Sequence, residues 1–184
     1  MGLIKNFNNE LSLWFNKHGI SNLEFVEGED FCYYQNLHIV QWGVFENPKS
    51  YIHFAQFLSE YGLEPKVDNF VISLLHEVGH YMTMHYFDKN AWVDDTAAKE
   101  NVEGDGSIGI DYWYWELPIE FAANMWAINW ANAHPNELQE LTILCFKWLN
   151  IIGNDEDIMQ AIADWQDDVK EGIVVPLCLE EDYE

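Results

Sequence analysis

The chain has 184 residues, 49% of them hydrophobic, which is enough for one domain with a sizeable core. Its 32 acidic residues face only 8 lysines and no arginine, and the net charge of −24 argues against nucleic acid or an anionic membrane surface as a partner. A basic protein or peptide would be attracted, and an equal alternative is that the acidity serves solubility.

The sequence gives no indication of export or membrane insertion. It contains neither a signal-peptide pattern nor an apolar run long enough to span a bilayer. The three cysteines, Cys32, Cys145 and Cys178, are widely spaced and indicate reduced thiols. We therefore expect a cytoplasmic protein.

The N-terminal part of the chain combines one helix with short strands. Residues 3–19 are predicted to form an amphipathic helix that ends at Gly19. Residues 23–27, 31–35 and 37–45 are β-rich runs separated by turn residues, which predicts a small antiparallel meander. The apolar face of the helix consists of Leu3, Phe7, Leu11, Trp14 and Phe15.

Two helices are predicted next. The first covers about residues 51–61 and contains His53, which we interpret as an ordinary surface or core histidine. The second lies within Phe70–Phe87, with Asp68 as its candidate N-cap. Its apolar stripe consists of Phe70, Val71, Leu74, Leu75, Val78 and Met82.

The second half of the chain is predicted to be mostly helical. Residues 88–111 are irregular and acidic, and we expect a loop there, with a short helix near 96–102 and calcium binding as a minor alternative. The elements that follow are helices at 113–133, 136–152 and 155–170 and a strand at 173–175.

Together these elements predict one α+β domain over residues 1–184. It is mainly helical, and its small antiparallel sheet is expected to pack on the helix within Phe70–Phe87. The core of the domain covers residues 20–133, followed by helices at 136–170 and an acidic tail at 176–184.

The most informative motif is His76-Glu77-Val78-Gly79-His80. Residues four apart share one face of a helix, so His76 and His80 can hold one metal ion together, and Glu77 can act on a water molecule there without ligating the metal. This arrangement is typical of zinc peptidases. The alternative is that both histidines are core residues bonded to carbonyl groups. Gly79 costs about 1 kcal/mol of helix stability against alanine, which is explained if another backbone passes close by.

A catalytic zinc usually has three protein ligands, and we expect the third on the helix at 113–133. Glu120 is favoured because small residues follow it and let two helices approach, and Glu116 is the alternative. His85 has rotated off the face of His76 and His80. Asn124 shares a face with Glu120 and can accept the N–H of a ligating imidazole. The possible oxyanion donors are Tyr112, Tyr114 and His134.

These motifs resemble those of the gluzincins, and most closely those of the small ImmA/IrrE-type metallopeptidases of phages and bacteria. That family carries His-Glu-x-Gly-His and later a Glu followed by Ala-Asn-x-Phe-Ala; here Trp126 stands in the Phe position. The resemblance covers about residues 70–133. It implies a zincin-like fold, His76, His80 and Glu120 as zinc ligands, and Glu77 as the general base.

The sequence therefore predicts a zinc-dependent metallopeptidase that hydrolyses a peptide bond in a specific, possibly basic, protein substrate. Two alternatives stay open. One is an acidic phage-type binding protein that blocks a basic or nucleic-acid-binding partner and whose zinc site is structural or vestigial. The other is a metal-dependent hydrolase of non-peptide amides.

Overall fold

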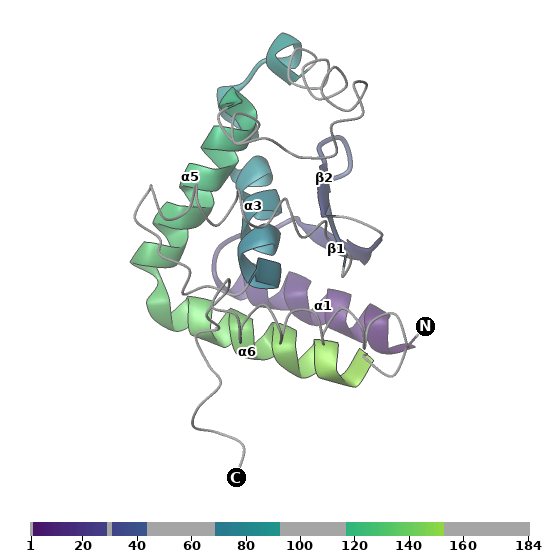
Figure 1. Cartoon of the computed structure of the whole chain (residues 1–184). Coiled ribbons are helices and arrows are strands. Elements are labelled where there is room, and N and C mark those ends of the chain that lie inside the picture. Colours follow the sequence, from purple (N-terminus) through teal and green to yellow (C-terminus); the bar gives the residue numbers. More distant parts are fainter. Residues whose placement is uncertain (1, 29–30, 44–68, 93–116, 153–184) are drawn as a thin grey trace, which may run out of the picture.

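The computed structural model describes residues 2–28, 31–43, 69–92 and 117–152 (Figure 1). They are mainly helical and include a three-stranded mixed sheet, so an α+β fold is confirmed at this level. The helices are α1 (Gly2–Lys17), α3 (Asn69–Thr83), the 3-10 helix η1 (Met84–Tyr86), α5 (Pro118–Ala133) and α6 (Pro135–Ile152). The strands are β1 (Glu24–Glu27), β2 (Cys32–Tyr34) and β3 (Ile39–Trp42).

Several predicted elements lie outside the described residues. These are the helices at 51–61, 96–102 and 155–170, the strand at 173–175, the acidic tail, most of the loop at 88–111, Asp68, and the start of the helix at 113–133.

Helix α1 ends at Lys17, just before the predicted stop at Gly19. Gly19 adopts a φ of 85°, which a glycine tolerates well, and the N–H of Ile20 bonds to the carbonyl of Phe15 across the helix end. The predicted apolar face is buried, with one exception: Leu3, in the first turn, is 47% exposed.

The pairing of the strands differs from the predicted antiparallel meander. The order in the sheet is β1-β3-β2, with β1 parallel to β3 and β2 antiparallel to it. Strand β3 carries Val40 and Trp42, neither of which has exposed surface, and its central position pairs both of its edges. The last strand therefore lies between the first two, where a meander would put the second.

An aromatic core joins the N-terminal helix to the rest of the fold. The ring of Phe7 lies 5.1 Å from that of Trp42 and 6.1 Å from that of Trp148 in α6. The indole N–H of Trp42 donates to Asn8 Oδ1 at 2.7 Å, and that of Trp148 donates to Glu10 at 2.8 Å. These two indoles, of Trp42 and Trp148, thus keep their one polar atom bonded inside the core.

Helix α3 is the central helix, and it is buried on all sides from Phe70 to His80. Figure 1 shows α5 alongside it, with α1 and α6 packed together at one end of the pair. The sheet also packs on α3, through β2 and β3. None of the described helices is both long enough and apolar enough to cross a membrane.

Backbones of α3 and α5 touch at Gly79. A Cβ added at Gly79 would lie 2.5 Å from the carbonyl oxygen of Ala123 and 3.0 Å from its Cα. Atoms of this kind cannot approach so closely, so only glycine fits at this point of α3. The expected close backbone neighbour of Gly79 is therefore Ala123.

We predict that Gly79→Ala lowers the free energy of unfolding, although alanine is the better helix former. The methyl group must push α5 away from α3, and overpacking of this kind costs about 1–3 kcal/mol, against a gain of about 1 kcal/mol in helix propensity. Chemical denaturation of the metal-free protein measures the change. Gly2→Ala is the matched control because nothing lies within 4 Å of its added Cβ. Equal stability of Gly79→Ala and the wild type would contradict the packing argument.

Candidate metal centre

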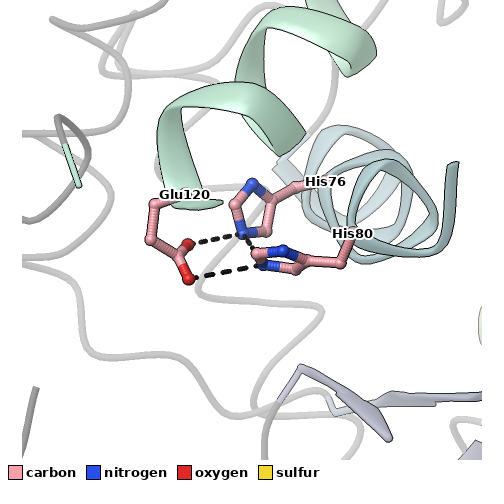
Figure 2. A group of neighbouring side chains, drawn as sticks. All are labelled: His76, His80 and Glu120. Atoms are coloured by element: carbon pink, nitrogen blue, oxygen red, sulfur yellow. Dashed lines mark hydrogen bonds and ion pairs between the residues drawn. The ribbon is translucent and has the colours of Figure 1, made fainter. Parts of the chain in front are cut away.

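Helices α3 and α5 run antiparallel (Figure 1). They bring His76, His80 and Glu120 together (Figure 2). The Nε2 atom of His76 lies 3.0 Å from Glu120 Oε2, and that of His80 lies 3.4 Å from Glu120 Oε1. The two Nε2 atoms are 3.1 Å apart. One potential ligand atom from each residue thus lies within 4.8 Å of the others, so the group can hold a metal ion.

All three side chains are removed from solvent. Glu120 is 1% exposed, and His76 and His80 are each 6% exposed. Burial alone would lower the pKa of His76, but the adjacent Glu120 carboxylate, with help from Glu77 and Asn124, raises that pKa above its ordinary value of 6.5. Burial alone would raise the pKa of Glu120, but His80 and His76 hold it well below its ordinary value of 4.5. The carboxylate is therefore ionised and ready to act as a ligand.

Asn124 sets the orientation of the His76 ring. Its Oδ1 atom lies 2.7 Å from His76 Nδ1, on the side of the imidazole away from Glu120. An amide oxygen only accepts, so Nδ1 carries a proton, and Nε2 is the nitrogen that faces Glu120 and His80 and could bind a metal. Asn124 is completely buried and lies one turn after Glu120 on α5. This contact is the one that the sequence predicts for Asn124.

Hydrogen bonds among the described residues do not satisfy the whole cluster. The Nδ1 atom of His80 and the Nδ2 atom of Asn124 are buried and have no partner there. Each buried polar atom without a partner costs free energy. A cluster of two imidazoles and one carboxylate, so close together and so dry, fits a metal ion better than a network of hydrogen bonds. The donor set of two nitrogens and one oxygen suits zinc.

Glu77 lies beside the cluster but is not one of its three members. Its Oε1 atom is 3.8 Å from His76 Nε2, and the residue is 7% exposed. The carboxylate is therefore near the point that a metal would occupy, without being part of the group whose ligand atoms converge there.

The other residues considered from the sequence fall into three groups. Glu116, Tyr112 and Tyr114 lie outside the described residues. His85 is exposed on η1, and its ring lies against that of Tyr86 at an interplanar angle of 44°. His134 is the C-cap of α5, and its Nδ1 bonds to the carbonyl of Trp130. At 1.5 Å per residue, His134 lies about 21 Å along the helix from Glu120. His134 is therefore too far away to be an oxyanion donor.

Sequence reasoning missed Trp92. Its ring centroid lies 6.0 Å from that of His80, at an interplanar angle of 56°. The only sequence feature that could have indicated this residue is Asp88, a capping residue that starts a new turn just before it. The spacing of residues along the chain does not indicate that this turn folds back onto α3.

Comparisons with protein-family models, curated proteins and solved structures gave no match to this chain. The metal-binding group is therefore defined by its own geometry. What the structure supports is a buried site of His76, His80 and Glu120 that can hold a metal ion.

We predict that the purified protein binds about one zinc ion per chain. Glu120→Gln should weaken zinc binding at least as much as the loss of an outer-shell partner does, which is about 10- to 100-fold. The amide keeps the shape of the side chain but loses the charge of the ligand. Zinc competition with a chromophoric chelator gives the affinity, and elemental analysis gives the stoichiometry. Glu140→Gln, which removes an exposed carboxylate from α6, serves as the control. Unchanged zinc affinity in Glu120→Gln would exclude Glu120 as a ligand.

In the metal-free protein we predict that Glu120→Gln is most destabilising between about pH 4.5 and 6.5. The raised pKa of His76 adds stability that is fully present below 6.5 and is lost as the pH rises through its folded-state value. The lowered pKa of Glu120 adds stability that is present above 4.5 and is lost as the pH falls through its folded-state value. Both contributions therefore coexist only in this window.

Urea unfolding in the presence of a chelator, at pH 5.5 and at pH 8.5, measures the effect. The difference between the wild type and Glu120→Gln should be smaller at pH 8.5. The Glu140→Gln variant corrects for the change in net charge. A difference that grows with pH would show that no ion pair forms in the cluster.

Proposed function

We propose that this protein is a zinc-dependent metallopeptidase of the gluzincin type, similar to the ImmA/IrrE metallopeptidases, and that it cleaves a specific protein substrate. The observation that carries the proposal is the convergence of His76, His80 and Glu120 on one point, with Glu77 beside it. A structural zinc site usually has four protein ligands, whereas three leave a position open for a reacting molecule.

In this mechanism His76, His80 and Glu120 would hold the zinc, and Asn124 would keep the His76 ring in the tautomer that can bind it. The chemistry that zinc would supply there is that of a Lewis acid, which would lower the pKa of a water molecule and polarise the carbonyl group of the substrate.

Glu77 handles the proton. Its carboxylate accepts one from the attacking water and then delivers it to the amine of the leaving group, so the same oxygen atoms act first as base and then as acid. The position of Glu77, next to the ligands but outside their set, suits this role. The low exposure of Glu77, at 7%, keeps competing bulk water away from that proton.

We predict that Glu77→Gln abolishes peptide cleavage and retains zinc binding. The amide has nearly the same shape but cannot accept the proton, and removal of a general base of this kind costs about 100- to 10,000-fold in rate. The measurement is mass-spectrometric cleavage profiling of a proteome-derived peptide mixture with zinc-loaded wild type and with the variant.

The outcomes separate the candidate functions. Cleavage by wild type alone supports the peptidase. Full activity of zinc-loaded Glu77→Gln would refute the role of Glu77. If wild type cleaves amides of small molecules but no peptide, it is a hydrolase of another amide class.

A second candidate function, an acidic binding protein, is favoured by the net charge of −24 without any arginine. In that case the protein would form a complex with a basic partner that weakens as salt increases. Glu77→Gln would leave the affinity of that complex unchanged, and neither protein would be cleaved.

A further inference from the structure

Trp92 is the aromatic side chain next to the candidate metal site. Its indole lies 6.0 Å from the imidazole of His80, and it reaches the site from the segment after η1. Helix α5 contributes Glu120 and Asn124, which both contact His76. The His80 side of the site is therefore bordered by Trp92.

The turn that carries Trp92 is fixed by its own hydrogen bonds. The carboxylate of Asp88 accepts from the backbone N–H of Asn90 at 2.9 Å and from that of Ala91 at 3.0 Å, and the N–H of Trp92 bonds to the carbonyl of Asp88 at 3.5 Å. An N-cap of this kind orients the residues that follow it. The position of the indole thus comes from a capped turn and from contact with the core.

The indole is half-buried, so part of its surface remains available to another molecule. An indole face binds apolar groups, and among the aromatic side chains it binds cations best. Among the described residues, the charges nearest to it in the chain are Asp88 and Lys89, both exposed, and Asp94 and Asp95 follow it in the sequence. The protein as a whole carries a net charge of −24 and lacks arginine, so its field attracts a cation and repels an anion.

We propose that Trp92 forms one wall of a subsite for a cationic side chain of the substrate, lysine or arginine, in the residue next to the bond that is cleaved. This inference rests on the proposed metallopeptidase function. It assigns to Trp92 a role in specificity. The indole lies next to His80, a candidate metal ligand, and has no group that could serve as the general base.

The test uses binding and does not require turnover. Lysine hydroxamate and norleucine hydroxamate have the same zinc-chelating group and the same side-chain stem, and only lysine carries the ammonium group. Calorimetric titration of each into the zinc-loaded protein gives the ratio of the two dissociation constants. The variants are Trp92→Ala and Trp92→Phe, with Trp126→Leu as the matched control, since Trp126 is a half-buried tryptophan whose ring stacks on Trp130.

The wild type should bind lysine hydroxamate about 2- to 30-fold more tightly than norleucine hydroxamate, which is the range for a cation over an indole. Trp92→Ala should reduce this ratio to about one, Trp92→Phe should keep part of it, and Trp126→Leu should keep all of it.

Three results would overturn the inference: equal or tighter binding of norleucine hydroxamate, a lysine preference that survives in Trp92→Ala, or no binding of either probe by protein that holds zinc. A lysine preference that survives in Trp92→Ala would come from the electric field of the whole protein. A norleucine preference that is lost in Trp92→Ala would show an apolar subsite. Failure of the protein to bind zinc at all would instead refute the proposed function, so the two failures are distinct.

Discussion

The contact between Gly79 and the backbone of Ala123 sets the distance between α3 and α5, and the candidate metal site depends on that distance. The Glu120 side chain is short, and it lies 3.0 Å from His76 Nε2 and 3.4 Å from His80 Nε2 only because the two helix backbones touch one turn away. Any side chain at position 79 would separate the helices and open the triangle of ligand atoms. The loss of helix propensity at a mid-helix glycine is thus offset by what the close approach makes possible.

The same close approach buries charged groups, which costs desolvation free energy. A carboxylate that is 1% exposed and two imidazoles that are 6% exposed have given up almost all of their hydration. Coulombic attraction in such a place often does no more than balance the cost of desolvation, and apolar residues of similar size would be at least as stable. Stability therefore does not explain why His76, His80 and Glu120 lie in the interior between α3 and α5. Binding of a cation would explain it, because a divalent ion would give the carboxylate and both Nε2 atoms a common partner.

Local sequence patterns predicted most of the site, and contacts between distant segments account for what they missed. The i, i+4 spacing of His76 and His80 and the run of alanines after Glu120 describe two helix faces, and each face is a property of one short segment. The parallel pairing of β1 with β3 and the packing of Trp92 near His80 depend on where a turn returns the chain. Spacing within one element carries no information about that return path. For the same reason the number of polar neighbours of Asn124 could not be counted from the sequence, although its bond to His76 could be expected.

The acidity of the chain and the buried cluster act over different distances. Both can therefore contribute to one function, that of the proposed peptidase. Exposed carboxylates act on a partner across a Debye length of about 8 Å at physiological ionic strength, and they raise the local concentration of cationic chains. The cluster acts only on atoms that reach the ligands, and Trp92 lies at the border between these two ranges. If the field of the protein attracts basic chains, the site must also be able to bind a cationic side chain. An indole beside His80 can bind a cation without placing another charge next to the candidate metal ligands. In the proposed peptidase, electrostatic attraction and local recognition would therefore favour the same class of substrate.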